Sequence, residues 1–296
     1  MSKTKQLIVL VGPAGSGKST LAWELTQSKN GGYYRINQDD QGKKGHWDAF
    51  TPILHTENNI VIDRMNFNKQ QRAKYLEPAK KHGYKTKIIV LHENQSTCLS
   101  RMKDRKDHPT ITTEEQARSA LNTFFTKYEK PTKDEADEIE FRYPKLSQWP
   151  WSTIIVDIDG TLSNTDHRQK FMDGPKKDWP GFFGAMHLDP VNEPIKKLTN
   201  TMRTNNVVCI VSGRPDNYRD VTTKWLDDNK IFYDHVFMRP RNDSRADTII
   251  KEIILDFELR TRYTILMSVD DRQSVVKMWR DNGVTCLDVA GPKGDF

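Results

Sequence analysis

Two short motifs in the sequence contain residue types that handle phosphate groups. The first, Gly12-Pro13-Ala14-Gly15-Ser16-Gly17-Lys18-Ser19-Thr20, follows an apolar run at residues 7–11. The second, Asp157-Ile158-Asp159-Gly160-Thr161, follows an apolar run at residues 154–156. The first pattern is suited to holding a nucleoside triphosphate, and the second to forming and hydrolysing an acyl phosphate. A chain with both is expected to add a phosphate to one molecule and to remove one from another.

The glycine-rich motif has the complete phosphate-binding loop pattern and the flanking segments that such a loop requires. An apolar strand precedes it and a helical segment at residues 21–27 follows it. Glycines allow backbone N–H groups to curl around phosphates, while Lys18 can reach the β- and γ-phosphates and the Ser19 hydroxyl can hold Mg²⁺. The predicted ATP-binding and Mg²⁺-binding set is Gly12, Gly15, Gly17, Lys18, Ser19 and Thr20.

Further charged residues in the first half are placed where they could act on the bound triphosphate. Asp39, in Asn37-Gln38-Asp39-Asp40, follows an expected second strand at 33–36 and could accept the proton of an attacking hydroxyl. An Asx turn or a helix N-cap is the alternative use of this motif. Asp63 ends the strand expected at 59–62, where nucleotide-binding folds place a metal-facing carboxylate. Arg101 and Arg105, one helical turn apart, could close on the transferring phosphate or lie on a solvated face.

The second motif resembles the first motif of the haloacid dehalogenase superfamily. In this interpretation Asp157 is the nucleophile, and Asp159 protonates the leaving oxygen and then activates water. Ser212 and Arg214 follow a run at 207–211, Lys251 lies in a helical stretch, and Asp270-Asp271 end a run at 264–269. Singly, these residues would be a turn serine, a surface lysine and a helix cap. Their common order favours a phosphatase whose Mg²⁺ ligands are Asp157, Asp159, Asp270 and Asp271.

The elements that position both motifs follow the α/β pattern, because short apolar runs alternate with longer amphipathic segments. Parallel strands are expected at 7–11, 33–36, 59–62, 87–91, 153–156, 207–211 and 264–269, with a weaker candidate at 233–238. A polar, acidic segment at 131–138 separates the halves, and prolines at 144 and 150 break regular structure after it. These features predict two domains, at residues 1–143 and 151–296.

Composition limits the classes of protein to which the chain can belong. A length of 296 residues suits two domains, and no apolar stretch approaches the roughly 18–20 residues that span a bilayer. The three cysteines, Cys98, Cys209 and Cys286, have no metal-ligand spacing, which suggests a reducing compartment and packing in the core. Residues 1–150 carry a formal charge of +7 and residues 151–296 carry −1. The first half is therefore the expected side for a polyanionic ligand.

Taken together, the two sites resemble those of the phage-type bifunctional polynucleotide 5′-kinase/3′-phosphatases, over nearly the whole length and in the same order. The resemblance implies a P-loop kinase domain with a parallel sheet, followed by a haloacid dehalogenase-like phosphatase domain. It makes Asp39 the general base and Arg101 and Arg105 the lid arginines. It implies a phosphatase set of Asp157, Asp159, Arg168, Ser212, Arg214, Asp247, Lys251, Asp270 and Asp271.

The sequence departs from that family at two places near the kinase site. Gly42 stands where the family has an arginine that holds the phosphate of the acceptor, and Lys43 and Lys44 follow it. In Asp63-Arg64-Met65-Asn66, alignment on Asn66 puts Arg64 opposite the acidic residue of the family. The sequence therefore predicts the phosphoryl-transfer reaction better than it predicts which acceptor molecule is preferred.

The resemblance implies a phage-encoded enzyme that acts in the host cytoplasm on DNA or RNA ends. It would transfer the γ-phosphate of ATP to a 5′-hydroxyl and hydrolyse a 3′-phosphate through an aspartyl phosphate, leaving ends for a ligase to join. The family also suggests a homo-oligomer without a membrane partner. One alternative is a small-molecule kinase fused to a metabolite phosphatase, and another is an end-binding scaffold with decayed sites. The intact Lys18-Ser19 and Asp157/Asp159 pairs argue against the scaffold.

Overall fold

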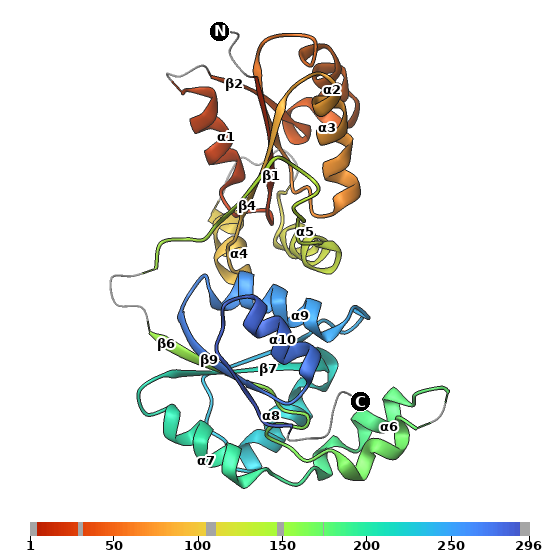
Figure 1. The fold of residues 1–296 in the computed structure, drawn as a ribbon, viewed down its shortest axis with the longest axis vertical. Coiled ribbons are helices and arrows are strands. Elements are labelled where there is room, and N and C mark those ends of the chain that lie inside the picture. Colours follow the sequence, from red (N-terminus) through yellow and green to blue (C-terminus); the bar gives the residue numbers. More distant parts are fainter. Residues whose placement is uncertain (1–4, 29–31, 105–110, 147–150, 174, 291–296) are drawn as a thin grey trace. The chain divides into compact units, whose positions relative to one another are not determined.

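The computed structural model describes residues 5–28, 32–104, 111–146, 151–173 and 175–290. The chain divides into two compact units, Met1–Lys145 and Leu146–Phe296, and each is an α/β unit (Figure 1). None of the helices in the described ranges is long and apolar enough to cross a membrane. The domain limits of 1–143 and 151–296 stay predictions.

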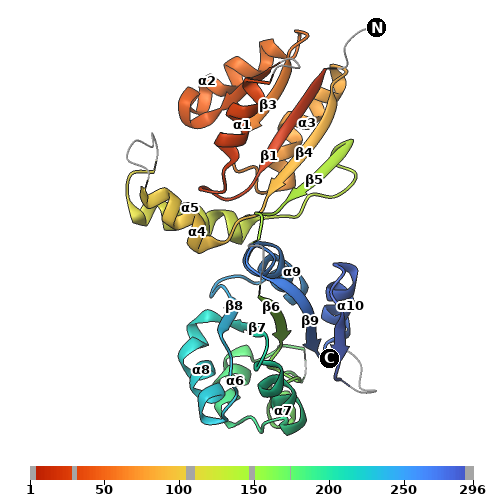
Figure 2. The ribbon, with the colours of Figure 1, turned by 90° about the vertical axis from the view of Figure 1, so that its left-hand side faces the viewer.

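The first unit is built on a parallel sheet with the strand order β2-β3-β1-β4-β5. Figure 2 shows β3, β1, β4 and β5 of this sheet side by side. Its strands are β1 (Gln6–Val11), β2 (Tyr33–Asn37), β3 (Asn59–Asp63), β4 (Lys85–Leu91) and β5 (Glu138–Arg142). The central strand β1 is buried from residue 7 to residue 11 because it lies between β3 and β4. The strands expected at 7–11, 33–36, 59–62 and 87–91 are confirmed. The edge strand β5 was not expected, since Glu138, Glu140 and Arg142 give it the polar character of a loop.

Side-chain caps begin several helices of this unit. The Asn37 side chain accepts hydrogen bonds from two backbone N–H groups of the first turn of α2, and Thr113 forms a capping box with Gln116 at α5. Ala22 of α1 packs with Ile8 and Leu10 of β1, which places α1 against the central strand. The helices are α1 (Lys18–Thr26), α2 (Gln38–Ile53), α3 (Lys69–Lys81), α4 (Gln95–Asp104) and α5 (Glu114–Lys127).

The second unit has its own parallel sheet, with the order β10-β9-β6-β7-β8. Its strands are β6 (Ser152–Val156), β7 (Val207–Pro215), β8 (His235–Arg239), β9 (Thr264–Asp270) and β10 (Cys286–Asp288). The runs expected at 153–156, 207–211 and 264–269 are confirmed, and the weaker candidate at 233–238 overlaps β8. Strand β7 continues to Pro215 through a shift in register after Ser212. The short strand β10 was not expected because its three residues are too few to form a pattern.

Helices cover both faces of this sheet, and alternate residues of β6 face opposite cores. Ile155 packs in one core with Trp279, and Ile154 packs in the other with Trp225. The cysteines expected in the core, Cys98, Cys209 and Cys286, are all buried. The helices are α6 (Trp179–Gly184), α7 (Glu193–Met202), α8 (Arg219–Asp228), α9 (Asp247–Ile254) and α10 (Gln273–Asp281). In a parallel sheet the carboxyl ends of β6, β7 and β9 meet at one edge, which is where ligands bind in such folds.

A buried ion pair ties the segment before β5 to α3. The Arg72 side chain is fully buried and donates to both carboxylate oxygens of Glu135, at 2.7 and 2.9 Å. The same guanidinium donates to the carbonyls of Asn66 and Glu129, at 3.2 and 3.0 Å. These contacts satisfy a charge that would otherwise be buried without a partner.

Glu135→Ala is expected to lower the free energy of unfolding by about 3–5 kcal/mol, because it leaves the Arg72 charge buried and uncompensated. Urea unfolding of the full chain would measure the loss. Glu114→Ala, which removes an exposed partner of Arg118, is the matched control and should cost about 1 kcal/mol or less. Equal small losses for both variants would contradict the role given to Arg72.

Candidate active sites of the two units

The glycine-rich loop joins β1 to α1, and its glycines are required by the backbone and by close packing. Gly15 and Gly17 have left-handed φ angles of 83° and 94°. A Cβ on Gly15 would lie 2.5 Å from the Cys98 carbonyl oxygen in α4. Lys18 is buried in the first turn of α1, and its Nζ donates to the Pro13 carbonyl at 2.7 Å. Ser19 and Thr20 follow it in that turn, so the predicted ATP-binding residues form one loop at a helix N-terminus.

The motif that contains Asp39 begins α2, and here the capping role falls to its first residue. The Asn37 Oδ1 accepts from the backbone N–H groups of Asp39 and Asp40, at 2.6 and 3.0 Å. The Asp39 side chain is exposed in this first turn. Asn37 is therefore the residue that caps α2. Asp39 lies at the carboxyl edge of the sheet, on the same side as the phosphate-binding loop, and this position is compatible with the predicted general base.

Asp63 is part of a buried network that joins the ends of β2 and β3. Its Oδ2 accepts from Arg35 Nη2 at 2.6 Å and from Asn37 Nδ2 at 2.9 Å. The Arg35 guanidinium also lies 4.9 Å from the centre of the Trp23 ring. This arrangement makes Asp63 a residue that fixes strand ends, and it gives no support to the metal-facing role that its position suggested.

Gly42 interrupts α2 with backbone angles of φ 73° and ψ 171°. An added Cβ would meet no atom within 4 Å, so the strain of a larger residue would come from the backbone alone. An arginine at this position would therefore be strained in the backbone conformation that the chain adopts here. Lys43 and Lys44 follow with exposed side chains.

Arg101 reaches the phosphate-binding loop from α4. Its Nη1 donates to the Gly15 carbonyl at 3.3 Å, and its Nη2 pairs with Glu93 Oε2 at 2.9 Å. Glu93 is buried beyond the end of β4 and was not singled out from the sequence, although a polar residue after a buried strand is a usable signal. The contact with Gly15 favours a lid over a solvated face. Arg105 lies outside the described residues.

The second site centres on Lys251, which is buried among carboxylates at the carboxyl edge of the sheet. Its Nζ lies 2.8 Å from Asp157 Oδ1, 2.9 Å from Asp270 Oδ2 and 3.5 Å from Asp247 Oδ2. Trp279 also donates to Asp270, at 3.1 Å. Lys251 is therefore no surface lysine, and the fold brings three segments of the sequence to one ammonium group.

Asp271 completes a group of three carboxylates that could hold a divalent cation. Ligand oxygens of Asp157, Asp270 and Asp271 all lie within 4.8 Å of one another. Close packing fixes Asp271, because a Cβ on Gly160 would lie 2.0 Å from its Oδ2. Clustered carboxylate oxygens are the ligands that Mg²⁺ prefers. The residues present thus fit the predicted metal.

The charges around this group shift the pKa values of its members. Burial raises the pKa of Asp157 well above its ordinary value, and Asp270 and Asp271 raise it further against the opposing effect of Lys251. Burial and Asp270 raise the pKa of Asp271 to about 6. Burial alone would lower the pKa of Lys251, but Asp157 and Asp270 raise it well above its ordinary value. Lys251 and Arg272 together do not balance the three carboxylates of this group, and a surplus of negative charge is what a cation site requires.

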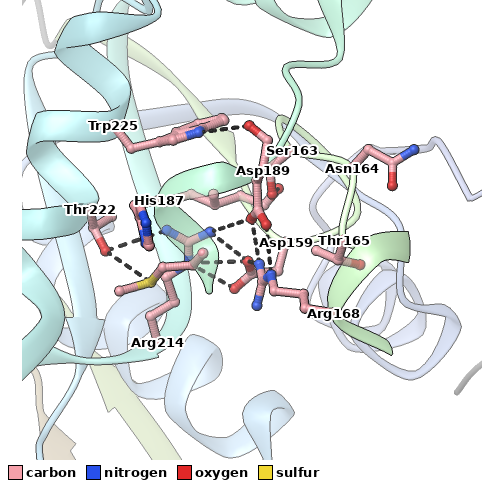
Figure 3. A network of polar contacts seen from close by, with 12 residues as sticks. Asp159, Ser163, Asn164, Thr165, Arg168, His187, Asp189, Arg214, Thr222 and Trp225 are labelled. Atoms are coloured by element: carbon pink, nitrogen blue, oxygen red, sulfur yellow. Dashed lines mark hydrogen bonds and ion pairs between the residues drawn. The ribbon is translucent and has the colours of Figure 1, made fainter. Parts of the chain in front are cut away.

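Asp159 lies outside that group and is held instead by two buried arginines (Figure 3). Arg214 donates to it from Nη2 at 2.6 Å and from Nε at 3.0 Å, and Arg168 Nη2 also pairs with it. Burial would raise the pKa of Asp159, but Arg214 and Arg168 outweigh burial and hold the pKa well below its ordinary value. The metal role predicted for the Asp159 side chain therefore has no support in its position.

A second carboxylate, Asp189, fixes both arginines and was missed from the sequence. It accepts from Arg168 Nε at 2.7 Å and Nη2 at 2.5 Å, and from Arg214 Nη2 at 3.2 Å. His167 Nε2 lies 2.8 Å from the same carboxylate. Asp189 is buried, and its backbone carbonyl accepts from Trp225 Nε1 at 2.9 Å. The His-Leu-Asp-Pro segment that contains it has no catalytic spacing, so only the fold reveals this role.

The remaining predicted residues also lie at this edge. Ser212 is buried, and its Oγ accepts from the Arg214 backbone N–H at 3.2 Å, within β7 where the register of the strand shifts. Asp247 begins α9 and pairs with Arg239 at 3.3 Å. A Cβ on Gly213 would lie 2.4 Å from Asp247 Oδ1, so these two segments touch. Ser212 therefore lies in a strand and not in a turn, at the edge of the sheet where the other residues of the site gather.

Comparisons with known proteins agree with this geometry. Residues 151–296 match the family model of the polynucleotide kinase PNKP phosphatase domain. Residues 7–49 and 46–131 match the model of an AAA domain. A protein of Autographa californica nuclear polyhedrosis virus, assigned as a bifunctional polynucleotide kinase/RNA ligase, is 26% identical over 95% of this chain and 42% of its own length. The chain thus spans less than half of that relative.

Two further proteins are similar. The Arabidopsis thaliana transcription factor bHLH140 is 27% identical over 65% of this chain and 20% of its own length. A chain of the Pnkp1/Rnl/Hen1 RNA repair complex is 22% identical, with coverage of 100% of this chain and 97% of that one and a TM-score of 0.43. The chain therefore joins an N-terminal P-loop unit of the AAA class to a C-terminal phosphatase unit that belongs to the polynucleotide kinase PNKP phosphatase family.

Proposed function

We propose that this chain repairs nucleic-acid ends through a 5′-hydroxyl kinase and a 3′-phosphatase. The observation that carries the proposal is the presence of both phosphate sites on one chain, with the second in a phosphatase unit of the PNKP family. The charge of +7 on residues 1–150 favours a polyanionic acceptor over a small metabolite. The products, a 5′-phosphate and a 3′-hydroxyl, are the ends that a ligase joins, and a ligase is the proposed downstream partner.

In the proposed kinase reaction the loop holds ATP, and the side chains around it act on the γ-phosphate. Lys18 turns from the Pro13 carbonyl to the β- and γ-phosphates, and Ser19 supplies a hydroxyl that would hold Mg²⁺. Asp39 takes the proton of the 5′-hydroxyl as its oxygen attacks the γ-phosphorus. Arg101, which already contacts Gly15, and Arg105 stabilise charge on the transferring group.

In the proposed phosphatase reaction an Asp157 oxygen attacks phosphorus, and the bond to the 3′-oxygen breaks. Asp159 gives its proton to that oxygen, then takes a proton from water as the water attacks the aspartyl phosphate. Lys251 holds the Asp157 carboxylate in place throughout. A Mg²⁺ ion held by Asp157, Asp270 and Asp271 would offset the negative charge of the phosphate.

The arginines couple phosphate binding to the protonation of Asp159. While Arg168 and Arg214 contact Asp159, its carboxylate stays ionised and cannot act as an acid. Phosphate oxygens are competing acceptors for the same guanidinium groups, and binding weakens their hold on Asp159. The pKa of Asp159 then rises, so that the acid forms only when substrate is present.

Lys18→Ala is expected to lower 5′-phosphorylation of a hydroxyl-ended oligonucleotide by at least about 100-fold, because it removes one preorganised phosphate contact. Release of 3′-phosphate should be unchanged, since Lys18 belongs to the other unit. Transfer from labelled ATP in single turnovers measures the first activity. Lys69→Ala removes an exposed lysine and serves as the control.

A nucleoside acceptor beside the oligonucleotide separates the proposed function from a small-molecule kinase. Preference for the nucleoside would contradict the polynucleotide assignment. Loss of both activities in a folded Lys18→Ala protein would contradict the independence of the two sites.

Asp157→Asn is expected to abolish 3′-phosphate release and to spare the kinase, because an amide is a poor nucleophile and a poor metal ligand. Beryllium fluoride with Mg²⁺ should form an acyl-phosphate mimic on Asp157 and inhibit the wild-type phosphatase. Chelation of divalent cations with EDTA should stop it as well. A phosphorylated peptide that excludes residue 157 would overturn the assignment, as would full activity in EDTA.

Asp189→Asn is expected to lower kcat of the phosphatase about 10- to 100-fold, the size of a lost charge-assisted contact. Removal of this charge leaves Asp159 to balance both Arg168 and Arg214, and it replaces charged hydrogen bonds to residue 189 by weaker neutral ones. Kinase activity and the circular dichroism spectrum should be unchanged. Asp228→Asn alters an exposed partner of Lys224 and should have no effect on either rate. Unchanged phosphatase kcat in Asp189→Asn would show that Asp189 does not position the arginines.

A further inference from the structure

An aromatic cluster adjoins the arginines of the phosphatase site. The Arg168 guanidinium lies 4.1 Å from the centre of the Phe182 ring, and its Nη1 donates to the Phe182 carbonyl at 3.4 Å. Trp179 packs edge-on against Phe182, with ring centres 6.0 Å apart and an interplanar angle of 85°. Both aromatic residues belong to α6 (Figure 2). The ring of Phe182 thus packs against Arg168, and the indole of Trp179 packs against Phe182.

The cluster continues to the segment that carries the second arginine. Phe183 stacks on Trp179 at 5.7 Å and 21°, and Tyr218 lies 5.3 Å from Phe183. Tyr218 follows Arg214 by four residues along the chain. The rings therefore connect the two segments that position the guanidinium groups at Asp159.

The outer ring of this cluster is accessible to solvent and lies beside positive charge. Trp179 is 46% exposed, whereas Phe182 is 8% exposed and Phe183 and Tyr218 are partly buried. The Lys177 Nζ lies 5.9 Å from the centre of the Trp179 ring. An exposed indole with a neighbouring ammonium is the combination that binds single-stranded nucleic acid, through base stacking and backbone attraction.

We propose that Trp179 stacks with the base of a nucleotide adjacent to the 3′-phosphate, while Lys177 attracts the backbone. This inference rests on the proposed 3′-phosphatase function and specifies its substrate as an end with unpaired bases. A base has to leave its duplex before it can present a face to the indole. Because every base has such a face, this contact discriminates little among sequences.

Trp179→Ala is the decisive variant, tested on a single-stranded oligonucleotide with a 3′-phosphate. Loss of one stacking contact should raise KM about 5-fold or more and leave kcat nearly unchanged. Trp179→Phe should retain most of the affinity because it keeps an aromatic face. Trp151→Ala is the matched control, since Trp151 is 69% exposed and precedes β6 at the opposite edge of the sheet.

A second substrate isolates the base from the backbone. The same oligonucleotide with abasic sites in place of its two terminal nucleosides keeps every phosphate and removes the stacking partners. The KM of wild type and of Trp179→Ala should then coincide. A base-dependent difference for Trp179→Ala, absent in Trp151→Ala, would support the proposal. An equal loss on both substrates would overturn it, and so would no loss on either.

The outcome for wild type separates this inference from the function on which it rests. If wild type releases phosphate from the oligonucleotide and Trp179 has no base-dependent effect, only the stacking contact is wrong. If wild type hydrolyses a base-free phosphate ester such as glycerol phosphate and leaves the oligonucleotide intact, the proposed function fails and the inference fails with it.

Discussion

The phosphatase unit depends on the burial of Lys251 among carboxylates at the end of a parallel sheet. Its Nζ contacts Asp157 at 2.8 Å and Asp270 at 2.9 Å, which joins residues from the ends of β6 and β9 to a residue of α9. A buried ammonium is tolerated only with partners of this kind, and a buried carboxylate group of this density requires more positive charge than one lysine gives. The negative charge that remains is what would let the same residues hold a cation. The charges of Lys251 and its carboxylate partners therefore both hold these segments together and account for the proposed cation site.

The arginine pair shows how a functional group can be held ready by a residue that does no chemistry. Arg168 and Arg214 are fully buried, and their two charges are matched by Asp159 and Asp189. Asp189 has further contacts of its own, because His167 also contacts its carboxylate and Trp225 donates to its backbone carbonyl. In the proposed reaction Asp159 is the partner that the arginines exchange, because a bound phosphate would compete with it for their N–H groups. In the proposed reaction Asp159 transfers the proton and Asp189 holds the arginines in place. These two roles explain why two carboxylates contact the arginines.

The sequence predicted the site residues that lie close together along the chain. It did not predict the contacts that the fold makes between separate segments. The loop around Lys18 and the Asp157/Asp159 pair each lie within a few residues, after apolar runs that mark strands, and both were predicted with the strands that carry them. Asp189 acts through arginines that are distant in the sequence, and the residues beside it have no spacing that indicates those partners. Glu93 pairs with Arg101 in the next helix, and its place after a buried strand was a signal that was not used. Strand β5 was missed for another reason, since an edge strand exposed to water tolerates charged residues at every other position. The metal role of Asp159 stays a prediction, and its side chain lies against Arg168 and Arg214 because spacing alone does not tell where a carboxylate points.

The two sites solve opposite electrostatic problems with the same architecture. Both lie at the carboxyl edge of a parallel sheet, where backbone groups and helix N-termini face a common space. In the first unit the loop, Lys18 and Arg101 present donors, in a half of the chain with a charge of +7, which suits two polyanions at once. In the second unit the carboxylates of Asp157, Asp270 and Asp271 repel an incoming phosphate until a cation binds, and the neutral set of two arginines and two aspartates lies beside them. Attack by a carboxylate demands this second arrangement, since the nucleophile is itself an anion. In the proposed kinase reaction the nucleophile is a neutral hydroxyl, so the donors of the loop, with a Mg²⁺ that Ser19 would hold, would face less repulsion.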